Sequence, residues 1–277
     1  MELEVIENKG NKLRFLLKGS TYTFVNSLRR TIMSEVPTLA IEDIILVENT
    51  SPVLDEMVAH RLGLIPLTTP IDEFTIAKEC ENCGGEGCQF CSVPLTLEVE
   101  ASLDETRVAY SKDLHSDDPK IRPVSDKIPI AKLGPGQKIT LEAIAMMGRG
   151  KDHAKWAPAV TCSYRYYPKV EQDPSKCTGC MDCVEACPKN ILNVTKKIVT
   201  LTDPLECLLC DLCTNACTYD SLKMGHVDGD FIFLLETTGA ISPLDTFRKA
   251  TEILKNKAKD FENEYKIALE QYLKKKS

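Results

Sequence analysis

Eight cysteines in one short segment carry the clearest chemistry in the sequence. Four of them follow the spacing C-x2-C-x2-C-x3-C, and the other four repeat it thirty residues later, from 177 to 207. The two runs are Cys177, Cys180, Cys183 and Cys187, then Cys207, Cys210, Cys213 and Cys217. Three closely spaced thiolates can wrap one face of an iron–sulfur cubane if a fourth thiolate comes from elsewhere. The doubled spacing therefore predicts cluster binding, and zinc held by the same cysteines is the alternative.

The cysteine block, over about residues 170–222, resembles the bacterial two-cluster ferredoxin module. In that family the fourth cysteine of each run serves the other cluster, so the resemblance implies two [4Fe–4S] clusters with exchanged ligands. The implied sets are Cys177, Cys180, Cys183 and Cys217 for the first cluster, and Cys207, Cys210, Cys213 and Cys187 for the second. The sequence departs from the family pattern at Thr218, where a proline is expected.

A second group of cysteines lies upstream, in the loop 80–91. Cys80, Cys83, Cys88 and Cys91 form two C-x2-C pairs, and the glycines between them allow the chain to fold back in a tight turn. Four thiolates with tetrahedral reach suit Zn²⁺, so we expect a structural zinc site. An empty site and a pair of disulfides are the alternatives. Cys162 stands apart and is expected to be a buried thiol.

The overall charge argues against a protein that binds nucleic acid directly. The 41 acidic residues outnumber the 34 basic ones, which gives a net charge of −7, whereas phosphate-binding proteins usually lean basic. The sequence shows no signal-peptide pattern and no apolar run near the roughly 20 residues that span a bilayer. We therefore expect a cytoplasmic protein without membrane contact, where clustered cysteines indicate metal. The four histidines show no catalytic pairing, so no catalytic residue is predicted.

The elements that must position these cysteines follow from hydrophobic periodicity. The expected elements are a hairpin over 1–17, helices over 20–35 and 55–62, strands over 39–47 and 230–236, and a small antiparallel β unit over 95–145. Ser20 or Thr21 can cap the first helix, and Met57, Val58 and Leu62 are expected to face inward in the second. In the β unit, Leu95, Leu97, Val99, Ala101 and Leu103 alternate with polar residues, as in a half-buried strand. The cysteine loop interrupts this unit near its start.

A long helix is expected at the end of the sequence. Ser242, Pro243 and Asp245 are strong start signals, and the helix could run for about 30 residues, or about 45 Å. Its apolar stripe is Phe247, Thr251, Leu254, Ala258, Phe261, Tyr265, Ala268 and Tyr272. Such a stripe can be the core face of the same domain or an interface with a partner. We favour a partner interface, joined by Leu28 and Ile32 of the first helix, because the helix is longer than the N-terminal elements can cover.

Four segments outside the cysteine block resemble the alpha-type subunits of RNA polymerase. They are residues 24–42, His60–Leu67, Gly148–Trp156 and Glu236–Gly239. Together with the ferredoxin-like block, they resemble the alpha-type subunit family of archaeal DNA-directed RNA polymerase. The resemblance implies an α+β fold in three parts. These are a discontinuous dimerisation domain (1–45 and 226–277), an antiparallel β insert domain (46–167) with the four-cysteine loop at 80–91, and a ferredoxin-like iron–sulfur domain (168–225).

The resemblance also implies a function in transcription without catalysis. In this family the subunit forms a heterodimer with the small alpha-like subunit L. The heterodimer is the platform for the two large catalytic subunits and for subunits N and P. The clusters would then have a structural or redox-responsive role in assembly. The alternative is a ferredoxin-type electron-transfer protein, which would be expected to offer a flavin or substrate site, and the sequence shows neither.

Overall fold

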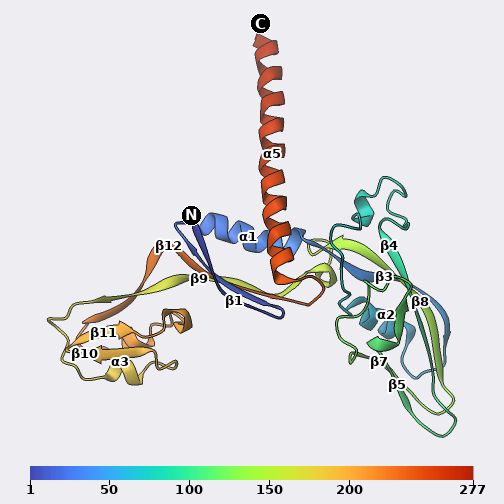
Figure 1. Ribbon diagram of the computed structural model, residues 1–277, viewed down its shortest axis with the longest axis horizontal. Helices are drawn as coiled ribbons and strands as arrows, with labels where there is room; N and C mark the ends of the chain where they lie inside the picture. The colour runs from blue at the N-terminus through green and yellow to red at the C-terminus, as the bar shows by residue number, and fades with distance from the viewer. Residues whose placement is uncertain (277) are drawn as a thin grey trace. The chain divides into compact units, whose positions relative to one another are not determined.

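The chain folds into two compact units, each assembled from segments that are distant in the sequence. A computed structural model describes residues 1–276 (Figure 1), so Ser277, the last residue of the expected dimerisation domain, lies outside the described residues. The first unit comprises residues 1–7, 14–26 and 163–234, and the second comprises 8–13, 27–162 and the residues from 235 onward. Both units mix helices with antiparallel sheets, which confirms the predicted α+β class.

The main sheet of the first unit has the strand order β1-β2-β12-β9. The strands are β1 (Glu2–Lys9), β2 (Lys12–Lys18), β12 (Leu222–Thr237) and β9 (Ala159–Gln172). β1 and β2 are the predicted N-terminal hairpin, with Gly10 at a φ of 55° in the turn. The rings of Phe15 and Phe233 stack at 5.0 Å between centroids, so aromatic contacts help to join β2 to β12.

The cysteine block of the first unit contains only short elements. They are α3 (Asp182–Glu185), β10 (Leu192–Thr195), β11 (Ile198–Leu201), the 3-10 turn η4 (Pro204–Glu206) and α4 (Leu212–Asn215). β10 and β11 pair as an antiparallel hairpin. The buried core of the block consists of Ile191, Leu192, Val199, Leu222 and Met224 together with Cys183, Cys207 and Cys213. A core this small stabilises a domain weakly without crosslinks or metal.

The second unit is built on a sheet with the order β3-β8-β4-β6. These strands are β3 (Pro37–Asn49), β8 (Lys138–Arg149), β4 (Ser92–Glu100) and β6 (Leu114–Ser116), and a smaller sheet pairs β5 (Arg107–Tyr110) with β7 (Pro129–Leu133). The predicted alternation is confirmed for Leu95, Leu97 and Val99, which are all buried. It is wrong for Leu103, which is 83% exposed because β4 ends at Glu100 and Leu103 lies in the following turn.

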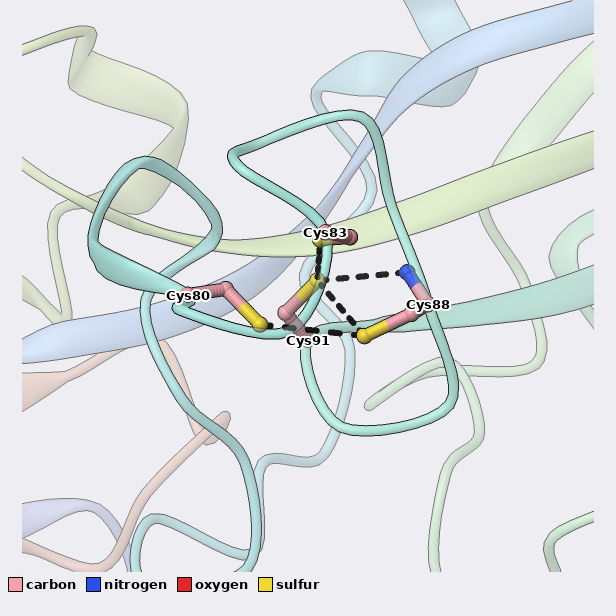
Figure 2. Close-up of side chains that lie close together, drawn as sticks. All are labelled: Cys80, Cys83, Cys88 and Cys91. Carbon is pink, nitrogen blue, oxygen red and sulfur yellow. Dashed lines mark hydrogen bonds between the residues drawn. The ribbon is translucent and has the colours of Figure 1, made fainter.

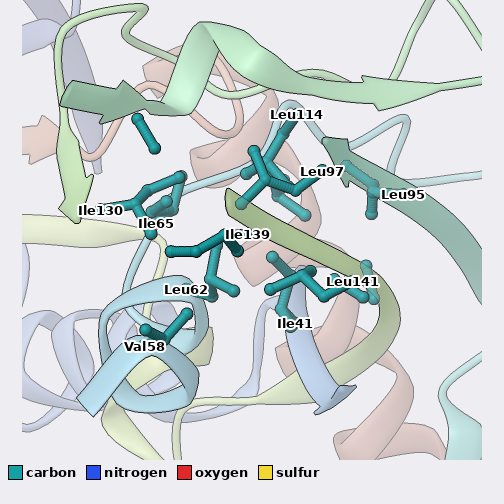
Figure 3. Close-up of a cluster of buried hydrophobic side chains, with 14 of the residues drawn as sticks. Ile41, Val58, Leu62, Ile65, Leu95, Leu97, Leu114, Ile130, Ile139 and Leu141 are labelled. Carbon is teal, nitrogen blue, oxygen red and sulfur yellow. The ribbon is translucent and has the colours of Figure 1, made fainter. Parts of the chain in front are cut away.

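Helix α2 (Asp55–Gly63) covers part of the core of the second unit. Figure 3 shows Val58 and Leu62 of this helix together with Ile41 of β3 and Leu141 of β8. Val58 and Leu62 are buried as predicted, whereas Met57, which was also expected to point inward, is 46% exposed. The helix turns only one face to the core, so a residue next to that face remains in solvent.

Helix α1 (Tyr22–Glu35) begins where the sequence predicts a cap. The backbone N–H of Phe24 donates to the Thr21 hydroxyl at 3.3 Å. Leu28 and Ile32 are fully buried within the single chain. The expectation that these two residues join a partner interface is therefore wrong, because they already belong to the core of this chain.

Helix α5 (Pro243–Lys276) is the long helix expected near the end of the chain. At its start the Asp245 N–H donates to the Ser242 hydroxyl at 3.1 Å, and that hydroxyl donates to the Asp245 carboxylate at 2.6 Å. The first turns are anchored, with Ala250 fully buried, while every residue from 255 to 275 is exposed. Within residues 1–276, no helix combines the length and the apolar character required to cross a membrane.

Candidate metal and cluster sites

The first cavity of the cysteine block brings together cysteines from both runs. Its walls include Cys177, Cys180 and Cys183 of the first run and Cys217 of the second. The remaining lining residues are Thr178, Gly179, Met181, Val194, Val199, Tyr219, Ser221 and Leu222. The four cysteines are those of the first implied ligand set, so the fold places this set in one mostly apolar pocket.

The second cavity also combines three cysteines of one run with one cysteine of the other. Cys207, Cys210 and Cys213 of the second run line it together with Cys187 of the first. The other lining residues are Pro188, Lys189, Ile191, Leu192, Leu201, Leu208, Asp211 and Met224. The last cysteine of each run therefore lies in the cavity of the other run.

The two runs have the same unusual backbone, which explains how closely spaced cysteines can face one cavity. Met181 has a φ of 73° directly before α3, and Asp211, thirty positions later, has a φ of 58° directly before α4. Gly179 and Leu209 also both have positive φ values. Left-handed residues between the cysteines turn the chain sharply, so successive side chains curve around one point.

The cysteine thiols are in a state that can bind metal. All thirteen cysteines of the sequence are free thiols. Burial raises the pKa of the Cys183 thiol, and it also raises the pKa values of Cys207 and Cys213. At Cys217 burial is outweighed by hydrogen bonds from Ser221, which lower its pKa. Because a bound metal stabilises thiolates directly, four free thiols in an apolar pocket fit an iron–sulfur cluster. Ligation by these eight cysteines stays a prediction.

The upstream cysteines converge on a single point (Figure 2). The sulfur–sulfur distances are 3.7 Å from Cys80 to Cys88, 3.5 Å from Cys83 to Cys91 and 3.8 Å from Cys88 to Cys91. All four sulfurs lie within 4.8 Å of one another. Four sulfurs held tetrahedrally at the usual Zn–S distance of about 2.3 Å would be about 3.8 Å apart. The loop geometry therefore fits a zinc ion.

The loop holds its thiols in an environment that differs from one cysteine to the next. Hydrogen bonding from the Gly85 backbone lowers the pKa of Cys83 to about 7. Burial raises the pKa of Cys91 to about 12. Gly85 and Gly87 have φ values of 101° and 100°, a conformation that residues other than glycine rarely adopt. These glycines fold the chain so that its amides point at the cysteines.

The last cysteine, Cys162, belongs to neither group. It is half-buried, and its thiol lies 3.8 Å from the Arg29 carbonyl oxygen. Burial raises the pKa of this thiol to about 12. A neutral thiol that donates to a backbone carbonyl has low reactivity; the burial expected for Cys162 is only partial.

Two arginines that the sequence analysis did not single out contact the cysteine block. The guanidinium groups of Arg14 on β2 and Arg165 on β9 both donate to the carbonyl oxygen of Leu205 in η4. Arg14 also donates to the Glu206 carboxylate at 3.0 Å. Glu206 directly precedes Cys207 in the sequence. Nothing in the local spacing of either arginine indicates this contact, because it joins residues that are far apart in the sequence.

The segment Gly148–Trp156 has a packing role in the second unit. The Trp156 indole N–H donates to the Met146 carbonyl oxygen at 3.0 Å. A Cβ on Gly148 would overlap the Trp156 ring, and a Cβ on Gly150 would overlap the Met33 carbonyl oxygen. Only glycine fits at these two positions. The residues of this segment that resemble alpha-type subunits are therefore explained by packing, without a catalytic or binding role.

Two family models match separate parts of the chain. The RNA polymerase Rpb3/RpoA insert domain matches residues 42–159, which contain the Cys80–Cys91 loop. A 4Fe-4S dicluster domain matches residues 176–221, which contain both cysteine runs. The chain therefore contains an iron–sulfur domain next to segments of an RNA polymerase subunit.

Relatives of known name match nearly the whole chain. The DNA-directed RNA polymerase subunit Rpo3 of Methanosphaera stadtmanae is 38% identical over 266 residues, covering 95% of this chain and 98% of that protein. Rpo3 of Methanosarcina acetivorans is 38% identical over 262 residues, covering 94% and 96%. The DNA-directed RNA polymerase II subunit rpb3 of Dictyostelium discoideum is 34% identical over 286 residues, covering 95% and 94%. The resemblance to the archaeal alpha-type subunits is thus confirmed, and the chain belongs to the Rpo3 family of DNA-directed RNA polymerase subunits.

Proposed function

We propose that this chain is a non-catalytic platform on which a DNA-dependent RNA polymerase assembles in the cytoplasm. It pairs with the small alpha-like subunit L, and the pair receives subunits N and P and the large catalytic subunits. The proposal is supported by the family of the chain and by a match that covers about 95% of its length. The net charge of −7 agrees with a subunit that contacts protein rather than DNA.

The observation that carries the pairing is the exposed apolar surface of α5. Phe261 is 72% exposed and Tyr265 is 59% exposed, and Leu269 and Leu273 extend the same part of the helix. Residues 255–275 have no buried position. Soluble monomers seldom leave large apolar side chains in solvent along more than five helical turns. A partner with a matching apolar helix would cover them.

The domain division belongs to the same proposal. Residues 1–45 and 226–277 form the dimerisation domain, 46–167 the insert domain and 168–225 the ferredoxin-like domain. The family matches at 42–159 and 176–221 support the last two. The N-terminal hairpin and the last strand, β12, are neighbours in a sheet with β9, which supports a dimerisation domain made from both ends of the chain.

The metal groups complete the proposal. Cys177, Cys180, Cys183 and Cys217 hold one [4Fe–4S] cluster, and Cys187, Cys207, Cys210 and Cys213 hold the other. Cys80, Cys83, Cys88 and Cys91 hold a structural zinc ion. Each group supplies crosslinks between segments of a small core, and a cluster can also exchange one electron. The protein side chains position the thiols, exclude water with apolar walls and fix the turns between ligands.

Affinity capture of the full chain from its native cells tests the proposal. We expect the small alpha-like subunit and the large polymerase subunits to be recovered in stoichiometric amounts. A ferredoxin-type electron carrier would instead bring down a flavin or other redox enzyme. Recovery of an oxidoreductase without polymerase subunits would overturn the assembly function.

A further inference from the structure

The two cysteine runs are preceded by turns that begin alike and then differ. Asp173-Pro174-Ser175-Lys176 leads into Cys177, and Asp203-Pro204-Leu205-Glu206 leads into Cys207. Because the rest of each run has nearly the same backbone, the two turns form a matched pair inside one chain. Any difference in how they are held can make the two cluster sites unequal.

The first turn has one hydrogen bond to the rest of its unit, from the Asp173 N–H to the Ser221 carbonyl oxygen at 2.9 Å, and within the described chain its side-chain bonds all lie inside the turn. The Asp173 carboxylate accepts from the Ser175 N–H at 3.1 Å and from the Ser175 hydroxyl at 2.6 Å. Residues 173–176 are all exposed. Local hydrogen bonds in solvent can exchange with water at small net loss, so residues 174–176 can open while the single backbone bond at Asp173 stays in place.

The second turn is held from outside by two strands. Arg14 of β2 donates to the Glu206 carboxylate at 3.0 Å, and both Arg14 and Arg165 donate to the Leu205 carbonyl oxygen. Residues 204–206 are half-buried, and Cys207 is buried. Hydrogen bonds from charged donors are stronger than neutral ones and are costly to lose when buried.

Basic side chains outnumber acidic ones around the second turn. Arg14 and Lys189 both pair with the Glu206 carboxylate, and Arg165 donates to the carbonyl oxygen of the neighbouring Leu205. The Arg165 Nε atom is buried without a hydrogen-bond partner in the described chain. An anionic group held by four thiolates would offset this excess of positive charge. The cavity lined by Cys187, Cys207, Cys210 and Cys213 is the neighbouring site that could hold one.

We propose that Arg14 and Arg165 clamp the turn before Cys207 to the β2 and β9 strands, so that the second cluster is retained and the first is lost preferentially. Losing a cluster requires its ligand segment to open. Opening at Cys207 breaks three hydrogen bonds from arginine side chains, whereas the bond that ties the turn before Cys177 to the rest of the unit is a single neutral backbone bond at Asp173. The two arginines are positioning residues for the second cluster. The inference rests on the proposed binding of two clusters.

Iron release from the full chain tests whether the first cluster is lost before the second. The chain is loaded anaerobically with iron and sulfide and challenged with EDTA, while cluster absorbance and iron per chain are followed. We expect two phases of equal amplitude. Cys183→Ser should leave only the slow phase, and Cys213→Ser only the fast one. Equal release rates for both clusters in the wild type would overturn the inference.

The clamp itself is tested by Arg165→Gln, which should speed the slow phase by about tenfold, since a hydrogen bond from a charged group is lost. Arg165→Lys should restore part of the retention because it keeps the charge. The matched control is Ser175→Ala in the first turn, which should leave the slow phase unchanged. A slow phase that survives Arg165→Gln and Arg14→Gln together would overturn the clamp.

Hydrogen exchange on the loaded wild-type chain gives a second measurement that needs no variant. The amides of 205–207 should be protected more strongly than those of 175–177. Equal protection would contradict the clamp even if the arginine variants failed to fold. A chain that takes up no iron would overturn the cluster assignment and this inference with it, whereas polymerase assembly is measured separately by affinity capture.

Discussion

Cys187 and Cys217 each lie at the end of one cysteine run and line the cavity of the other run. The spacing alone leaves their partners open, because a fourth ligand could come from any nearby segment. In the fold, the short helices α3 and α4 contain the third cysteine of each run and end before the fourth is reached. The fourth cysteine is thereby delivered to the neighbouring site.

This exchange of ligands predicts an unusual pattern in double variants. Cys187→Ser with Cys177→Ser should impair both clusters, although both changes lie in the first run. Cys187→Ser with Cys213→Ser should spare the first cluster, because both residues are proposed ligands of the second. Iron per chain and electron paramagnetic resonance after reduction measure the outcome. Loss of only one cluster in the first pair would show that the ligands are not exchanged.

The loop at 80–91 forms a closed set of four sulfurs, so it predicts metal binding that is independent of the iron sites. Cys83→Ser should lose about one zinc ion per chain and keep its iron, because a site with three thiolates binds zinc more weakly. Elemental analysis of the purified chain measures both metals. Cys162→Ser, outside both groups, is the control and should retain all metal. Zinc that persists in Cys83→Ser would exclude this loop as the site.

At the scale of elements, one carboxylate connects helix α1 to helix α5. Glu35 lies at the end of α1, 3.0 Å from Lys257 of α5 and 3.5 Å from Lys151 after β8. Burial alone would raise the pKa of Glu35, but the hydrogen bonds and charges of the two lysines outweigh it and lower the pKa. A lowered pKa in the folded state means that the ionised carboxylate stabilises the fold.

Glu35→Gln should therefore reduce the free energy of unfolding by about 1 kcal/mol at neutral pH. This loss of stability is fully present at pH values above the pKa of about 4.3 that a glutamate has in the unfolded chain. It disappears as the pH falls through the lower pKa that Glu35 has in the folded chain. Urea unfolding followed by the fluorescence of Trp156, the one tryptophan, measures it. Glu262→Gln, in an exposed pair with Lys266, should change stability little. A difference that grows in acid would contradict the ion pairs.

The elements themselves were largely predictable because their signals are local. The alternation in β4, the cap at Thr21 and the box at Ser242 and Asp245 each need only a few neighbouring residues, and each is present in the fold. Leu103 was misplaced because alternation cannot show where a strand stops. The expectation for Leu28 is wrong because an apolar stripe has the same sequence pattern whether this chain or a partner covers it.

The candidate sites were predictable to the extent that their ligands are close in sequence. The four cysteines of the 80–91 loop and the first three of each run follow from spacing. Arg14 and Arg165 could not be found in this way, since their contact with Leu205 depends on strands brought together by the whole first unit. The sequence gives only an indirect signal of this contact. Both runs follow an Asp-Pro pair, but the next two residues are Ser-Lys before Cys177 and Leu-Glu before Cys207.

At the scale of the whole molecule, the proposed cluster sites and the proposed pairing surface are separated along the chain. Both cysteine runs belong to the first compact unit, while all of α5 belongs to the second. The apolar side chains of the second unit's core are buried by its own strands and by α2. What remains uncovered is the later part of α5, so a partner is expected there rather than at the cluster sites.

This location of the interface predicts which substitutions break pairing. Phe261→Asp with Tyr265→Asp should abolish the 1:1 complex with the small alpha-like subunit, because each would place a carboxylate in an apolar interface at a cost of several kcal/mol. Leu28→Asp is a poor test, since Leu28 is buried in this chain and the change would unfold it. Leu103→Asp, at an exposed turn, is the matched control and should pair normally. Size-exclusion chromatography of the co-expressed chains measures the complex, and the fluorescence of Trp156, which lies in the same unit as α5, shows whether the double variant remains folded. A double variant that still pairs at wild-type yield would place the interface elsewhere on the molecule.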